Sequence, residues 1–196
     1  MDLELIDRQL LQLINGWNSP FWDTVMYVLT GVWIWIPFFA LVIWLLWKHY
    51  GKQLTLVLAF CALCLVLTDQ GSVWIKNKVQ RYRPSQNLEL KDQLHLHQNK
   101  DGRIYRGGMY GFVSSHAANS FGIAVLLMYF FKPVSKKWLW VFPLWAMVFC
   151  YTRMYLGLHY PADIFCGAVY GVLCGCFTIW LYKLSLQQIA KEQAQK

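Results

Sequence analysis

One short segment in the second half of the chain carries a cation, an imidazole and a carboxylate: Arg153, His159 and Asp163. Pro161 suits the first turn of a helix, because its missing N–H would have no intrahelical partner there. If a helix begins near Tyr160, the Asp163 carboxylate can accept the Nδ1–H of His159, which fixes the tautomer and leaves Nε2 free to react. This spacing predicts a histidine that acts as a nucleophile or a base.

A second segment gathers cations in front of a proline. Lys76 and Arg83 are seven residues apart, so two helical turns place both on one helix face. Pro84 biases Arg83 out of the helix. Basic side chains that extend to water are common at membrane surfaces, so this cluster alone would be weak evidence for a binding site.

A third segment opens an apolar run with two serines and a histidine. Ser114 or Ser115 can cap the N-terminus of the helix that follows, and His116 lies in its first turn. The free N–H groups and the dipole at such a helix end attract an anion. Together the three segments could hold a tetrahedral dianion, attack it and protonate the group that leaves.

The composition indicates a membrane protein. The 196 residues are 57% hydrophobic and 14% charged, whereas soluble domains carry about a quarter charged residues. The apolar residues form long runs, so we expect an all-α, polytopic helical membrane protein with about five to six transmembrane segments and an N-terminal interfacial helix. The net charge of +8 divides between short loops and the polar central region, which argues against a nucleic-acid partner.

Five apolar stretches are predicted to span the bilayer: residues 22–47, 54–74, 115–131, 138–158 and 161–184. A sixth crossing would result if residues 3–30 dipped into the bilayer as a re-entrant pair. The whole chain, 1–196, is predicted to be one membrane domain. Within it we expect an amphipathic segment at 1–20, a core with the three segments at 54–184 and a cytoplasmic tail at 185–196.

Lysines in the short loops predict the orientation, because basic loops mark the cytoplasmic side. The loop and helix-end lysines fall on one side of the predicted topology: Lys48, Lys52, Lys132, Lys136, Lys137 and Lys183. The three polar segments then share the extracytoplasmic side. A basic cluster there opposes the usual charge bias, which favours an anion site over an orientation signal.

The three segments resemble the motifs of the type 2 phosphatidic acid phosphatase superfamily, which includes membrane lipid phosphatases and the vanadium haloperoxidases. The family motifs K-x6-RP, PSGH and SR-x5-H-x3-D correspond to Lys76-x6-Arg83-Pro84, Val113-Ser114-Ser115-His116 and Thr152-Arg153-x5-His159-x3-Asp163. Order, charged residues and spacing within each motif all match. Val113, Ser115 and Thr152 replace Pro, Gly and Ser of the family pattern, and none of these changes removes a charged group.

The resemblance implies a phosphatase that forms a phosphohistidine and needs no metal or other cofactor. It implies that His159 attacks phosphorus, that Asp163 orients this ring, and that His116 protonates the leaving oxygen and then activates water. The remaining motif residues would bind the phosphate oxygens: Lys76, Arg83, Arg153, Ser114 and Ser115.

The predicted substrate is a phosphorylated membrane lipid, since a site at the helix ends lets the lipid tails stay in the bilayer. Candidates are undecaprenyl pyrophosphate, phosphatidylglycerol phosphate, phosphatidic acid and the phosphates of lipid A. The expected location is a bacterial inner membrane, with the site facing the periplasm or the cell exterior. Residues 85–110 form a long loop that could cover the site or bind the head group.

Two other classes of function stay open. A transporter could use the intramembrane charges Asp69, Arg153 and Asp163 to line a path, although the chain is small and has no evident inverted repeat. A catalytically inactive lipid-phosphate binder would also be consistent with the three motif departures. Measurement of phosphate release separates both classes from an active phosphatase.

Overall fold

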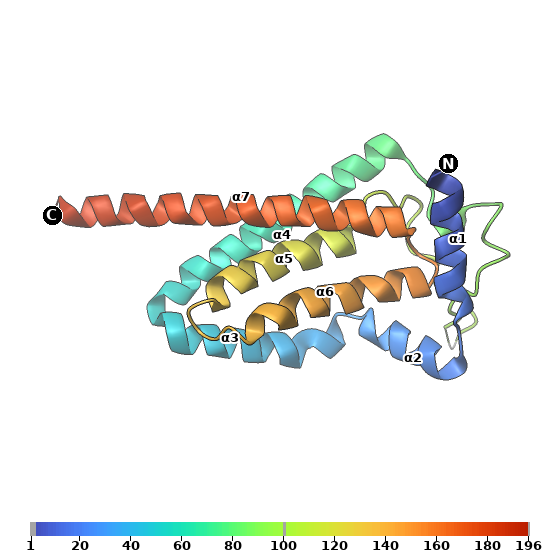
Figure 1. The fold of residues 1–196 in the computed structure, drawn as a ribbon, viewed down its shortest axis with the longest axis horizontal. Coiled ribbons are helices and arrows are strands. Elements are labelled where there is room, and N and C mark those ends of the chain that lie inside the picture. Colours follow the sequence, from blue (N-terminus) through green and yellow to red (C-terminus); the bar gives the residue numbers. More distant parts are fainter. Residues whose placement is uncertain (1–2, 100, 196) are drawn as a thin grey trace.

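The computed structural model describes residues 3–99 and 101–195, and within these ranges every regular element is a helix (Figure 1). The α-helices are α1 Leu3–Gly16, α2 Pro20–Leu29, α3 Ile36–Tyr50, α4 Leu54–Val79, α5 Ser115–Phe131, α6 Trp138–Tyr155 and α7 Pro161–Ala194. Short 3-10 helices lie at Trp33–Trp35, Gly51–Gln53 and Pro84–Gln86. The all-helical class predicted from the sequence is confirmed.

Two helical stretches of the described chain are long and apolar enough to cross a membrane, Trp33–Val79 and Pro161–Ala194. The first contains α3 and α4, and the chain reverses between them at Gly51, whose φ of 52° lies in the left-handed region (Figure 1). The number of five to six membrane crossings stays a prediction.

The helix α5 lies at the centre of the bundle and packs against α4, α6 and α7. Gly167, Gly171 and Gly175 of α7 face it. A Cβ on Gly167 would lie 2.6 Å from the Ser114 carbonyl oxygen, and one on Gly175 would lie 2.9 Å from the Gly122 carbonyl oxygen. Only glycine allows these backbones to approach so closely. The N-termini of α5 and α7 are therefore held side by side.

The predicted first span, 22–47, is not one helix. Helix α2 ends before Thr30 and Gly31, and α3 begins only at Ile36, with Pro37 in its first turn. A proline in a helix interior removes a backbone donor and clashes with the preceding turn, whereas the first turn tolerates it. The apolar composition continues through this break, so hydropathy alone could not detect it.

Other boundaries agree more closely. The predicted span 115–131 coincides with α5, and α6 ends three residues before the predicted 158. Helix α4 continues past the predicted 74 to Val79, which keeps Lys76 on a helix. Residues 185–194 of the predicted tail continue α7, which ends at Ala194.

Helix α1 crosses one end of the bundle (Figure 1). The face of α1 that packs against the protein is unusual, because it buries two polar side chains, Asp7 and Asn15, together with Leu11. Its outer face carries exposed leucines: Leu3, Leu5, Leu10 and Leu13. An outward apolar face is what an interfacial helix needs, while the inward polar groups bind the rest of the protein.

Candidate active site

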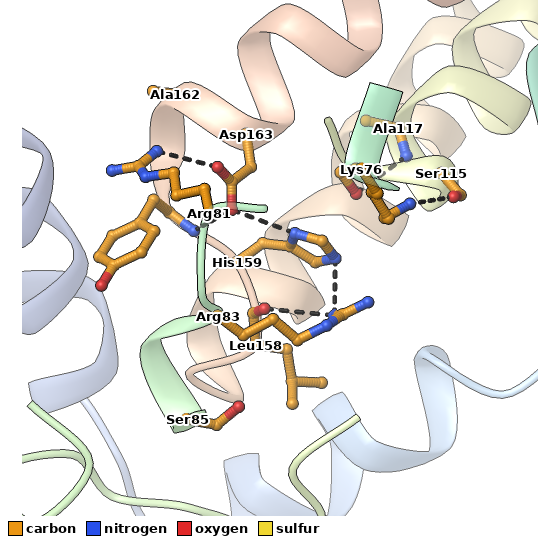
Figure 2. A network of polar contacts seen from close by, with 12 residues as sticks. Lys76, Arg81, Arg83, Ser85, Ser115, Ala117, Leu158, His159, Ala162 and Asp163 are labelled. Atoms are coloured by element: carbon orange, nitrogen blue, oxygen red, sulfur yellow. Dashed lines mark hydrogen bonds and ion pairs between the residues drawn. The ribbon is translucent and has the colours of Figure 1, made fainter. Parts of the chain in front are cut away.

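The three polar segments meet at the end of the bundle that α1 covers (Figure 1). They lie at the C-terminal ends of α4 and α6 and at the N-terminal ends of α5 and α7. The structure thus brings the three segments together at one end of the bundle. Figure 2 shows the resulting chain of contacts, from Arg81 through Asp163 and His159 to Arg83.

His159 lies in the short connection between α6 and α7 and is fully buried. Its Nδ1 lies 3.3 Å from Oδ2 of Asp163, and its Nε2 lies 2.8 Å from Nη1 of Arg83 (Figure 2). A guanidinium can only donate, so Nε2 accepts and Nδ1 carries the proton. The partners thus assign the tautomer in which Nε2 is unprotonated.

The surroundings of His159 also keep its ring neutral. Burial lowers the pKa of His159 well below its usual value, and the charges of Arg83 and Arg153 lower it further. A neutral imidazole is the form that can attack phosphorus. The same cations attract the phosphate that would be attacked.

Asp163 is the third residue of α7 and is fully buried. Its Oδ2 accepts hydrogen bonds from Nδ1 of His159 and from the Tyr160 N–H, the latter at 3.1 Å. Its other oxygen, Oδ1, accepts a hydrogen bond from Nη1 of Arg81 at 2.9 Å. The carboxylate is therefore fixed at both oxygens, and the predicted His159–Asp163 contact is present.

The two site arginines present unpaired N–H groups. Arg83 and Arg153 are 9% and 2% exposed, and the Nε of each has no hydrogen-bond partner among the described residues. Burial lowers the pKa of Arg83 to about 10, and the positive charge of Arg153 contributes to the shift. Two buried cations with unpaired donors form a favourable site for a dianion.

Arg153 is held by residues that the sequence analysis missed. Its Nη1 donates to Oγ1 of Thr30 at 2.6 Å and to the Tyr105 hydroxyl at 3.3 Å. Thr30 lies at the break between α2 and α3, and Tyr105 lies in the long loop. Neither contact could be found from spacing, because each joins residues far apart in the chain.

The serines of the second motif have different partners. Ser114 is the N-cap of α5, and its Oγ accepts the Ala117 N–H at 3.4 Å. Ser115 Oγ accepts hydrogen bonds from Nζ of Lys76 and, at 2.7 Å, from Oγ of Ser72. Lys76 thus reaches the N-terminus of α5, as its predicted role requires.

His116 lies half-buried in the first turn of α5, with its ring centroid 5.4 Å from that of Phe149. It is close enough to interact electrostatically with Arg153, His159 and Lys76. The structure therefore places His116 within electrostatic range of the candidate nucleophile, from a different helix.

The long loop packs against α1 and α2. Leu90 is buried with Leu11 and Tyr160. His95 Nε2 lies 2.8 Å from Oδ2 of Asp23, and His97 stacks on Tyr27 with the ring centroids 4.0 Å apart. The two loop histidines thus have structural partners.

Comparison with known proteins identifies the family. Residues 52–186 match the profile of the PAP2 superfamily. The chain belongs to this family. A lipid A 4'-phosphatase of Bacteroides thetaiotaomicron is 43% identical over 183 residues, which cover 90% of this chain and 75% of the relative. The protein is thus a PAP2 membrane lipid phosphatase similar to lipid A 4'-phosphatases, and a phosphoric monoester hydrolase.

Two solved structures share the PAP2 fold of this chain. The crystal structure of Aquifex aeolicus LpxE superposes with a TM-score of 0.64 at 22% identity and covers 87% of this chain and 93% of that one. A transmembrane PAP2-type phosphatidylglycerolphosphate phosphatase from Bacillus subtilis superposes with a TM-score of 0.67 at 17% identity. That superposition covers 92% of this chain and 86% of the other.

The three departures from the PAP2 motifs leave the charged groups in place. Val113 is buried, and Ser115 directs its hydroxyl to Lys76. Thr152 Oγ1 donates to the Phe149 carbonyl at 2.7 Å, so its hydroxyl bonds within α6. The substitutions leave the motif's set of cations and histidines unchanged.

Proposed function

We propose that this PAP2 phosphatase removes a phosphate from a lipid A-type head group through a phosphohistidine on His159. The observation that carries the proposal is the position of one buried ring between a carboxylate and a cation. Asp163 lies 3.3 Å from Nδ1, and Arg83 lies 2.8 Å from Nε2. The orienting group and the phosphate-binding group thus sit on opposite nitrogens.

In the first step, Nε2 of His159 attacks phosphorus while the bond to the leaving oxygen breaks. His116 donates its proton to that oxygen. The ring becomes positive as it forms the N–P bond, and the carboxylate of Asp163 stabilises it through the Nδ1–H. Arg83, Arg153 and Lys76 stabilise the charge on the transferred phosphoryl oxygens.

In the second step, His116 is the base that accepts a proton from water. The water oxygen bonds to phosphorus and the N–P bond breaks, which releases inorganic phosphate and restores neutral His159. Each proton given to the leaving group is thus recovered from water. Apart from the attacking water, these steps use side chains of the chain itself.

A lipid A-type substrate is supported by the relative and by an apolar groove beside the site. The Bacteroides thetaiotaomicron relative is a lipid A 4'-phosphatase. A groove of about 710 Å³ runs between α2, α5, α6 and α7, and its lining includes Trp22, Phe121, Met147 and Phe165. It reaches Pro161, two residues from Asp163, so an acyl chain there would keep its head group near the cations.

An extracytoplasmic site is supported by the position of the lysines. The turn between α3 and α4 and the turn between α5 and α6 lie at the end of the bundle away from α1 (Figure 1). These turns contain Lys52, Lys132 and Lys136, and basic short loops favour the cytoplasmic side. In a bacterial inner membrane the catalytic end would then face the periplasm or the cell exterior.

Phosphate release from a panel of lipids tests the proposal. The purified protein is assayed in detergent with EDTA against lipid A 4'-phosphate, undecaprenyl pyrophosphate, phosphatidylglycerol phosphate and phosphatidic acid. We expect release that is fastest with the lipid A phosphate, unaffected by EDTA and absent in His159→Ala. Inhibition by EDTA that Mg²⁺ reverses would point to another mechanism, and no release from any lipid would favour an inactive binder.

A trapping experiment tests the intermediate separately. Brief exposure to a ³²P-labelled substrate followed by alkaline quenching should leave label on the protein, because a phosphohistidine is stable to base and labile to acid. The label should be lost in acid and absent in His159→Gln. Label that survives acid would indicate a different covalent intermediate.

A further inference from the structure

Two charged side chains, Arg81 and Asp7, extend the contacts of Asp163 on the side away from His159. Arg81 donates from Nη1 to Oδ1 of Asp163 at 2.9 Å and from Nη2 to Oδ2 of Asp7 at 2.7 Å. Asp7 and Asp163 are 7% and 0% exposed, so both carboxylates are withdrawn from water. One guanidinium thus joins the helix α1 to the first turn of α7.

Asp7 also binds the start of α7 directly. Its Oδ1 accepts the Ala162 N–H at 2.8 Å, one of the N–H groups that a helix leaves unpaired at its N-terminus. A carboxylate at this end is favoured by the helix dipole. Asp7 therefore fixes the backbone next to Asp163, and it also fixes Arg81, which binds the Asp163 side chain.

Arg81 lies on the side of the pair that faces away from the phosphate-binding cations. It contacts the oxygen of Asp163 that does not face His159, and its guanidinium carbon lies 4.1 Å from the centroid of the Tyr160 ring. Arg83 reaches the same pair from the opposite end, at Nε2 (Figure 2). Arg81 and Arg83, two residues apart in the chain, thus contact opposite ends of the His159–Asp163 pair.

We infer that Arg81, held by Asp7 of α1, is a positioning residue that acts on the reaction through Asp163. The hydrogen bond at Oδ1 holds the carboxylate in place opposite Nδ1 of His159, and the guanidinium at 2.9 Å stabilises its negative charge. Both effects keep Nε2 unprotonated and directed at phosphorus. This inference rests on the proposed function of His159 and assigns to α1 a part in supporting the site.

A double-mutant cycle in the turnover assay tests the inference. Arg81→Gln should lower kcat roughly 10–100-fold with little change in KM, since misplacement of a reacting group by about 1 Å can cost that much. Arg81→Lys should recover part of the loss. In an Asp163→Asn background, Arg81→Gln should cost little more, because the group through which it acts is already altered.

A matched control separates this role from loss of a surface ion pair. Arg8 on α1 also joins two carboxylates, with 2.7 Å contacts to Glu4 and Glu89, but contacts neither Asp163 nor His159. Arg8→Gln should leave kcat unchanged. The inference would be overturned if the kcat losses of Arg81→Gln and Asp163→Asn multiplied in the double variant. A rise in KM at constant kcat for Arg81→Gln would also overturn it. If Arg81→Gln does not fold, Asp7→Asn takes its place in the cycle.

A spectroscopic readout does not depend on turnover. In ¹⁵N-histidine spectra, the signals that disappear in His159→Gln belong to His159, and they should show a protonated Nδ1 and an unprotonated Nε2. Arg81→Gln should mix the two tautomers, and an unchanged spectrum would overturn the inference. Absence of phosphate release by the unaltered protein would instead count against the proposed function, so the two failures are distinguishable.

Discussion

Nη1 of Arg83 lies 2.8 Å from Nε2 of His159, the ring nitrogen on the side opposite Asp163. Arg83 follows α4 in extended conformation before Pro84, and its N–H donates to the Met109 carbonyl at 3.0 Å. Pro84 and the hydrogen bond to Met109 thus fix the backbone of Arg83. Among the described residues, the Nε of its guanidinium has no hydrogen-bond partner. A bound phosphate can accept from this donor and replace the ring as the partner of Nη1.

Arg83→Lys should therefore be a severe change although it keeps the charge. The planar guanidinium of arginine can donate to a phosphate and to the His159 ring at the same time. The compact ammonium of lysine lacks this fixed arrangement of donors. We expect kcat/KM to fall roughly 100–1,000-fold, as for loss of one preorganised oxyanion donor. Inhibition by vanadate should weaken in parallel. Arg103→Lys, at a highly exposed loop residue, is the control, and an equal loss in both variants would contradict the role of Arg83.

The proposed role of His116 predicts a dependence on the leaving group. His116→Ala should slow hydrolysis of a lipid alkyl phosphate far more than that of 4-nitrophenyl phosphate, because nitrophenolate leaves without a proton. A difference of about 100-fold or more between the two losses is expected from the usual contribution of general acid catalysis. Similar losses with both substrates would count against proton donation.

The buried, neutral His159 should also affect stability. Its folded-state pKa is lowered by burial and by Arg83 and Arg153, whereas in the unfolded chain its pKa is about 6.5. As the pH falls below that value, the unfolded state binds a proton that the folded state does not, so the free energy of unfolding decreases.

Thermal unfolding in detergent at pH 7.5 and pH 5.0 measures this effect. We expect a lower Tm at pH 5.0, and the drop should be smaller in His159→Gln, whose amide does not titrate. Comparison of the two proteins cancels the titration of other groups. The same drop in both would show that His159 does not contribute to the pH dependence.

Gly111 lies against the side chains of His159 and Asp163, so a larger residue at this position should disturb their contact. Its N–H donates to the Arg81 carbonyl at 2.8 Å, and a Cβ added here would lie 2.7 Å from Oδ2 of Asp163 and 3.5 Å from Nδ1 of His159. Gly111→Ala should therefore push the carboxylate from the ring and lower kcat roughly 10–100-fold. Gly108→Ala is a matched control, because its Cβ would meet nothing within 4 Å.

Local sequence signals predicted the parts of the site that depend on spacing. The serine cap placed the start of α5, and the four-residue separation of His159 and Asp163 predicted their contact, since both lie at one helix N-terminus. The convergence of the three motifs also followed, because apolar runs of span length force alternate loops to opposite faces.

Long-range partners could not be predicted in this way. Arg81 is one of several cations in its segment, and its contacts with Asp163 and Asp7, on two other helices, distinguish it from Lys78. The support of Arg153 by Thr30 depends on the break after α2, where composition stays apolar. Contacts of this kind arise from tertiary packing, which leaves no periodic signal in the chain.

The length of α7 has a practical consequence. Its 34 residues extend about 51 Å at 1.5 Å per residue, well beyond a hydrocarbon core of about 30 Å. Figure 1 shows the C-terminal part of this helix projecting past the bundle, at the end remote from α1. A compact marker protein fused in helical register to Ala194 would be rigidly attached, and it would make this 23.0 kDa chain large enough to align in electron micrographs with the catalytic end unobstructed.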